Sequence, residues 1–284
     1  MKLSKGKQSK PELIWIYGVD GIGKSSFCAD APDPFVIDTE DRTGHLNVDR
    51  AVVHSLEEFY EALEYFKKSK KLTLVIDSLD WLEPMLIAVV LKKSGKKKIQ
   101  EKNDYGEGFT LLLDEYRNLI QALMPLRGER NIIFTGHSEV KTINDPQTGP
   151  FDRHQPKLYN KASALFREFV DCVLFANTEV LVKEKERRGF SDNVRWLFTE
   201  RRPAYDAKNS FDLPEKFELK QQNPFKYYIE LKGVGAKPED IRKTIEAWLP
   251  KLNDEDRKLV ESKMVGADVD GLKRIKNKIE EMFK

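Results

Sequence analysis

The residues from Gly18 to Ser26 have the types and spacing needed to bind phosphate. GVDGIGKS matches the pattern G-x-x-x-x-G-K-[ST], follows the apolar run LIWIY (13–17) and opens a helical pattern. Glycines let backbone N–H groups converge on phosphates, and a helix N-terminus adds partial positive charge. The alternative is a glycine-rich turn with an incidental lysine. The expected nucleotide contacts are Gly18, Val19, Asp20, Gly21, Ile22, Gly23, Lys24, Ser25 and Ser26.

Lys24 and Ser25 have separate expected roles in this loop. The lysine would reach the β- and γ-phosphates of ATP, and the serine hydroxyl would bind Mg²⁺. A carboxylate at the end of a neighbouring apolar strand would complete the metal site, and LTLVID (72–77) offers Asp77 there. The alternative for Asp77 is a helix N-cap just after the strand, and both roles are compatible.

Hydrolysis of ATP also needs a group that activates water. Ser78 follows Asp77, so no carboxylate stands directly after the expected metal ligand. Asp80 falls in a first helical turn, where an acidic residue is expected from the helix dipole alone. PFVIDTE (34–40) ends in Asp38 and Glu40, which share one face of a strand, and Glu40 is nearer the carboxyl edge where ligands bind. We predict Glu40 as the base and Asp38 as a helper or structural partner, against the alternative of a solvated acidic turn.

A polar residue after the strand NIIFTG (131–136) would lie beside the nucleotide. Thr135, His137 and Ser138 are the candidates, and His137 is the preferred γ-phosphate sensor. A single histidine is also commonly a polar residue with ordinary partners, so this alternative stays open.

Strands that alternate with helices must position these residues. Buried strands are expected at 13–17, 34–40, 72–77 and 131–136, and helices at 24–31, 55–66, 79–91 and 108–126. This alternation predicts an α/β fold with a mostly parallel sheet. The later strand-like pieces near 178–184 and 194–199 indicate an antiparallel hairpin at the sheet edge, and residues 138–161 read as one long polar loop.

Three segments are expected along the chain. Residues 1–11 read as a flexible tail, 12–232 as the ATPase core, and 233–284 as a small region of three helices (238–249, 254–265 and 269–283). The 284 residues carry a net charge of +2 and only two cysteines, which argues against a disulfide framework or a four-ligand zinc site. The longest apolar run, MLIAVVL, is too short for a membrane span, so we expect no membrane association and a cytoplasmic location.

With these residues in place, the chain resembles the phage-encoded RecA-like P-loop ATPases that act in recombination and single-strand annealing. The matching words are IYGVDGIGKSSF, FVIDTED, LVIDSLDWLE, NDYGEGF, NIIFTGHSE and AKNSFDLPE, which span residues 13–216. The resemblance implies a RecA-like core, ATP-dependent binding of single-stranded DNA, and an oligomer or filament with ATP at subunit interfaces. It is also consistent with a single-strand DNA-binding protein as a partner and with the cytoplasm of a bacterial host. It supports the roles given above to Lys24, Ser25, Glu40 and Asp77.

In such assemblies a basic residue of the neighbouring subunit reaches the γ-phosphate. FTERRPAYDAKNS offers Arg201 and Lys208 for this role. Relatives tend to carry an arginine after Lys-Asn, where this chain has Ser210, so surface ion pairing is the alternative for both residues.

Basic residues in two polar segments are candidate DNA contacts, because phosphate neutralisation and aromatic stacking together hold single strands. A solvated linker is the alternative for the lysine run. The candidates are Lys96, Lys97 and Lys98 in the segment 92–103, and Lys141, Arg153 and Lys157 in the segment 138–161. Two other functions stay open: an ATP-dependent loader or assembly module for a replication complex, and a small-molecule kinase, for which no arginine-bearing lid is evident.

Overall fold

The computed structural model describes residues 10–101, 105–146, 149–183 and 188–233, and residues 242–279 with gaps. The chain divides into two compact units, residues 1–228 and 229–284. Most of the expected tail, residues 1–9, lies outside the described part. Within the described residues, none of the helices combines the length and apolar character needed to cross a membrane.

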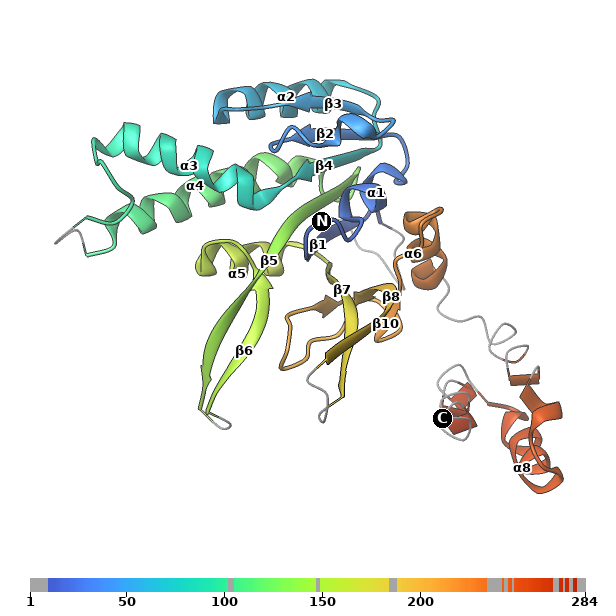
Figure 1. Cartoon of the computed structure of the whole chain (residues 1–284). Coiled ribbons are helices and arrows are strands. Elements are labelled where there is room, and N and C mark those ends of the chain that lie inside the picture. The colour runs from blue at the N-terminus through green and yellow to red at the C-terminus, as the bar shows by residue number, and fades with distance from the viewer. Residues whose placement is uncertain are drawn as a thin grey trace. The chain divides into compact units, whose positions relative to one another are not determined.

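One mixed sheet forms the centre of the first unit (Figure 1). Its path runs β10-β8-β7-β1-β5-β4-β2-β3, with β6 paired to β5 and β9 paired to β7. The strands are β1 (Leu13–Gly18), β2 (Pro34–Asp38), β3 (Asp49–Val52), β4 (Thr73–Asp77), β5 (Asn131–Asp145), β6 (Gly149–Pro156), β7 (Cys172–Lys183), β8 (Arg188–Phe198), β9 (Lys208–Asn209) and β10 (Lys216–Glu218).

The six strands from β7 to β3 pair in parallel, and β8 and β10 extend the sheet in antiparallel fashion. All residues of β1 and β4 are buried, as expected for central strands covered on both faces. The predicted α/β fold with a mostly parallel sheet and an edge hairpin is therefore confirmed.

Five helices of the first unit accompany the sheet: α1 (Lys24–Ala29), α2 (Leu56–Lys68), α3 (Leu79–Ser94), α4 (Glu107–Leu123) and α5 (Asn160–Phe169). The last four contribute buried side chains to its main core. The remaining helices are α6 (Pro224–Gly233), which runs across the boundary between the two units, and α8 (Asp254–Met264), which belongs to the second unit. The side chain of Ser55 caps α2 by accepting a hydrogen bond from the amide of Glu58. Gly95 ends α3 at φ 69°, a conformation that favours glycine.

The segment 138–161 is not the long loop that the sequence predicted. Residues 138–145 continue β5 and pair with β6 from Ser138–Pro156 to Asp145–Gly149. Figure 1 shows this β5–β6 hairpin extending out of the sheet. Its sequence is polar because the hairpin is mostly solvated, so the apolar alternation that identifies a strand is weak there. The short edge strand β3 was also missed, and it contains only four residues.

The second unit has a small apolar core of its own. Residues that share this core are Ile245, Leu249, Val260, Met264, Leu272 and Ile279. The helix predicted at 254–265 is confirmed by α8, and parts of those predicted at 238–249 and 269–283 lie outside the described residues.

Candidate active site

The phosphate-binding loop joins β1 to α1. Gly21 and Gly23 have φ of 68° and 109°, so side chains at these positions would strain the backbone. Gly18 is required for a different reason, because a Cβ there would lie 2.0 Å from the carbonyl oxygen of Ala176 on β7. The loop thus starts at the carboxyl end of β1, where β7 approaches closely, and leads directly into α1.

Lys24 lies in this loop with its ammonium group turned onto the backbone. Its Nζ donates hydrogen bonds to the carbonyls of Val19, at 2.9 Å, and Gly18, at 3.2 Å. Burial lowers the pKa of Lys24, and the surrounding carboxylates, Asp77 foremost, oppose that shift. A phosphate group would restore the lost solvation, so the lysine is suited to bind an anion at the loop.

Ser25 and Asp77 are in direct contact, as a shared metal site requires. The Ser25 hydroxyl donates to Asp77 Oδ2 at 2.7 Å, and the hydroxyl of Thr135 on β5 donates to Oδ1. Hydroxyl and carboxylate oxygens are the ligands that Mg²⁺ prefers beside nucleotide phosphates. These residues therefore fit a Mg²⁺ ion that would offset the phosphate charge.

Glu40 lies just beyond β2 and faces the same edge of the sheet. Its side chain is 7% exposed. Ser78 Oγ donates to Glu40 Oε1 at 2.5 Å, so the residue after Asp77 positions the carboxylate without replacing it. Burial raises the pKa of Glu40, although the Ser78 hydrogen bond opposes the shift. A held carboxylate with a raised pKa is suited to accept a proton from water.

Asp38 has a structural role in the same turn. It is fully buried and accepts hydrogen bonds from the amides of Glu40, Arg42 and Thr43 and from the Thr43 hydroxyl. Burial alone would raise its pKa, but these hydrogen bonds outweigh that effect and lower it. Asp38 therefore stays ionised and fixes the backbone that carries Glu40.

His137 completes a polar cluster with Asp80, Glu40 and Asp20. Its Nδ1 lies 2.8 Å from Asp80 Oδ2 and 3.7 Å from Glu40 Oε1, and its Nε2 lies 3.3 Å from Asp20 Oδ1. The amide of His137 also donates to Asp80 Oδ1 at 3.1 Å. The hydrogen bond to Asp80 raises the pKa of His137, so the imidazolium form is favoured. Burial would raise the pKa of Asp80, but His137 outweighs burial and lowers it.

These side chains surround one cavity of about 430 Å³. Its lining joins the phosphate-binding loop to Asp77, Glu40 and His137. The structure also brings in residues that the sequence predictions left out or explained otherwise. Those residues are Arg42 and His45, which line the cavity; Ser78 and Asp80, which bond to Glu40 and His137; and Arg195 of β8, whose guanidinium donates to the carbonyl of Ile22 at 3.2 Å.

Two of the more distant predicted residues do not fit their expected roles. Arg153 is buried and pairs with Asp206 at 3.2 Å, so its guanidinium is not available to DNA. Lys208 donates to the carbonyls of Arg167 and Val170, at 2.8 and 2.6 Å, at the end of α5. Its ammonium stabilises the helix terminus of its own chain, which leaves no free group for a neighbour's phosphate.

Most of the other basic candidates have side chains that are at least partly exposed to solvent. Arg201 has a side chain that is 69% exposed and lies 3.4 Å from Asp206. Lys97, Lys98 and Lys157 are exposed, and Lys141 pairs with Glu139 at 2.8 Å. Lys96 is mostly covered and pairs with Glu107 at 3.0 Å, so it suits DNA contact less well than its neighbours.

Comparison with known proteins identifies the family. A family model described as "AAA domain" matches residues 10–211, which include the whole cavity lining. The chain belongs to this AAA domain family. The family and the site together make it a nucleotide-binding P-loop ATPase.

No curated protein sequence matches this AAA-domain chain. Among solved structures, the flagellar accessory protein FlaH from Methanocaldococcus jannaschii is similar at 12% identity and a TM-score of 0.36. The match covers 74% of this chain and 84% of that one. So distant a likeness supports no statement about function.

Proposed function

We propose that this chain is a Mg²⁺-dependent ATPase that couples ATP hydrolysis to binding of single-stranded DNA in recombination or annealing. The observation that carries the proposal is the position of His137. This residue contacts the expected base, and it lies where β5 leaves the sheet and enters the β5–β6 hairpin. Its carbonyl also accepts a hydrogen bond from the amide of Lys157, which follows β6, at 2.8 Å. If the loss of the γ-phosphate moves His137, that movement would therefore also shift β5 and β6 at the base of the hairpin.

Each residue of the site has a defined task in hydrolysis. Lys24 and the loop amides bind the phosphates, and Ser25 and Asp77 would hold a Mg²⁺ ion, which would neutralise phosphate charge. Glu40 accepts the proton of the attacking water, and Ser78 holds the carboxylate in place. His137 is held by Asp80 as an imidazolium and lines the nucleotide cavity, where it can donate a hydrogen bond to an anionic phosphate oxygen.

The proposal includes an oligomer in which Arg201 serves a neighbour's ATP. The support is its exposure and its place in a loop anchored by Asp206, on which Arg153 and Arg167 also converge. Three arginines, from β6, α5 and this loop, therefore share the single carboxylate of Asp206. The resemblance seen in the sequence further supports a phage origin and action in the bacterial cytoplasm, alongside a single-strand DNA-binding protein.

The test measures binding of a fluorescent single-stranded oligonucleotide by anisotropy, with Mg²⁺ and either a non-hydrolysable ATP analogue or ADP. We expect tighter binding with the analogue and a steep loss of affinity with salt, because phosphate contacts release counterions. Light scattering on the same samples should show a larger assembly with the analogue and DNA. If neither nucleotide state binds the oligonucleotide at low salt, the DNA role is wrong, and nucleotide-dependent protein binding with negligible turnover would favour the loader.

A further inference from the structure

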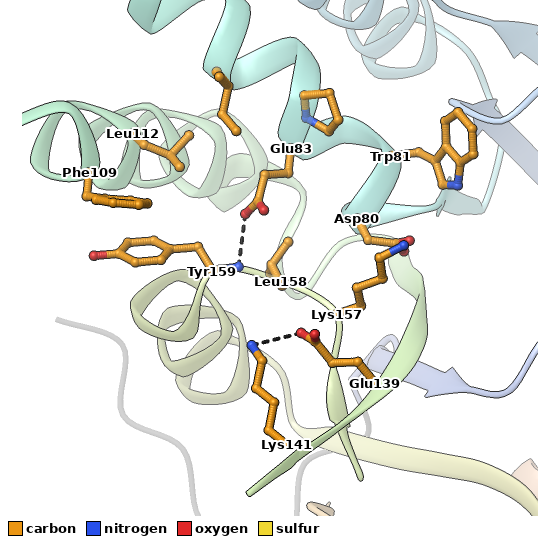
Figure 2. Close-up of a pocket in the computed structure, with 12 residues that line it drawn as sticks. Asp80, Trp81, Glu83, Phe109, Leu112, Glu139, Lys141, Lys157, Leu158 and Tyr159 are labelled. Atoms are coloured by element: carbon orange, nitrogen blue, oxygen red, sulfur yellow. Dashed lines mark hydrogen bonds and ion pairs between the residues drawn. The ribbon is translucent and has the colours of Figure 1, made fainter. Parts of the chain in front are cut away.

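A second cavity, of about 530 Å³, lies beside the ATP site (Figure 2). It follows the first turns of α3, from Asp80 past Glu83 to Ile87, and is closed on the other side by Phe109 of α4 and by residues 157–159. Its volume lies within the usual range of sites that enclose a small organic group. Of the side chains that line this cavity, Asp80 alone has a task assigned above in the ATP site.

Aromatic rings form its ends. Phe109 and Tyr159 stack with ring centroids 4.9 Å apart and an interplanar angle of 22°. Trp81 lies toward the opposite end in Figure 2 and is 45% exposed, so part of its surface is open to solvent. Because these aromatic rings line the cavity, a flat, unsaturated ring that can stack on them is the favoured occupant.

The position of Phe109 depends on a close backbone contact. A Cβ on Gly108 would lie 1.8 Å from the carbonyl oxygen of Ile99, so only glycine lets the 95–101 segment approach the start of α4 this closely. The contact fixes the first turn of α4, which carries Phe109. This contact explains why the motif NDYGEGF has a glycine at position 108, a residue that has no role in the ATP site.

The polar groups of the cavity suit a nucleotide. Glu83 Oε2 is fixed by the hydroxyl of Tyr116, at 2.7 Å, and the amide of Tyr159, at 2.9 Å. Such a carboxylate can also accept a hydrogen bond from an amino group of a base. Lys141 and Lys157 lie at the cavity beside Glu139, where their ammonium groups can meet the phosphates on either side of that base (Figure 2).

Asp80 links this cavity to the ATP site. It lines the second cavity, and its two carboxylate oxygens bond to the ring and the amide of His137. An occupant that moves Asp80 would therefore move His137, which lines the ATP cavity. The shared residue gives a direct physical route between the two sites.

We propose that this second cavity binds one unstacked base of a single-stranded nucleic acid and that its occupancy is transmitted to ATP hydrolysis through Asp80 and His137. The inference rests on the proposed function and adds the place and the chemical group that are recognised. It favours a nucleobase over a protein side chain because aromatic rings, a fixed carboxylate and two lysines meet in one cavity.

The test compares a fluorescent deoxycytidine oligonucleotide, whose bases carry an amino group, with an abasic oligonucleotide of the same length and charge, both with Mg²⁺ and the ATP analogue. We expect the wild-type chain to bind the base-containing strand about tenfold more tightly, the size expected for lost stacking on one or a few bases. Trp81→Ala should lose most of this preference, and its hydrolysis rate should respond less to the oligonucleotide. Tyr65→Ala, at a 59% exposed aromatic residue of α2 outside the cavity, is the matched control and should keep the preference.

The outcomes separate the two proposals. Equal binding of both strands by the wild-type chain would overturn the base site and leave DNA binding intact. An undiminished base preference in Trp81→Ala and in Tyr159→Ala would also overturn it and would leave the cavity to another ligand, such as a protein side chain. Absence of binding to either strand would overturn the base site together with the proposed function.

Discussion

Replacement of Glu40 by glutamine separates ATP binding from ATP hydrolysis in this site. Glutamine has nearly the same shape, and its carbonyl oxygen can still accept the hydrogen bond from Ser78 Oγ. The backbone of the turn is held independently by Asp38, so the loop should keep its form. What is lost is the ability to take a proton from water, because an amide is not a base at neutral pH.

General-base catalysis contributes about 10²–10⁴ in rate. At about 1.4 kcal/mol per factor of ten, Glu40→Gln should raise the barrier by about 3–5 kcal/mol. Affinity for ATP should stay equal or improve, because one negative charge is removed near the Asp77 and Asp80 carboxylates and the anionic phosphates.

The assay measures the hydrolysis rate by phosphate release and the ATP dissociation constant with a fluorescent analogue on the same preparation. Glu61→Gln, which makes the same change at an exposed position of α2, is the control and should behave as wild type. Hydrolysis by Glu40→Gln within threefold of wild type would refute the assignment of the base. A large loss of ATP affinity would show instead that Glu40 supports binding.

Other residues of the core give further expected outcomes. The pKa of Glu40 is raised and its ionised form is the base, so hydrolysis should be lost as pH falls through a value above the ordinary 4.5. A pH–rate profile measures this, and an acid limb at or below 4.5 would contradict it. Gly18→Ala places a Cβ 2.0 Å from the Ala176 carbonyl oxygen and should prevent stable folding, seen as a large fall in melting temperature, whereas a wild-type value would contradict the close approach of Gly18 to β7. Asp206→Ala leaves the buried Arg153 without its ion-pair partner and should cost about 3–5 kcal/mol of unfolding free energy in a denaturant titration, whereas a loss below about 1 kcal/mol would contradict this.

The parts of the site that follow from sequence are those with a local pattern. The phosphate-binding loop, Asp77 and Glu40 each follow a short apolar strand, so position along the chain was enough to place them at one sheet edge. Parallel pairing puts Asp38 opposite Asp77. Glu40 follows Asp38 by two residues, so it lies near the expected metal ligand, as the prediction of a catalytic base requires.

Features that depend on contacts between distant segments were not predictable. In the sequence, the helix dipole alone accounts for Asp80, and only the fold shows that β5 brings His137 to it. Arg153 is a candidate DNA contact in the sequence because nothing nearby indicates its burial. Its partner Asp206 lies 53 positions further along the chain. The sequence predicts a loop rather than the hairpin in residues 138–161, because a solvated ribbon lacks the apolar alternation on which strand prediction relies.

The proposed coupling of ATP turnover to single-stranded DNA can be measured directly. Steady-state ATP hydrolysis is followed at low salt with Mg²⁺, with and without a single-stranded oligonucleotide, using double-stranded DNA of the same length as control. We expect a rate that rises several-fold with the single strand, less with the duplex, and that falls back as salt is added. A rate unchanged by saturating single-stranded DNA would contradict it.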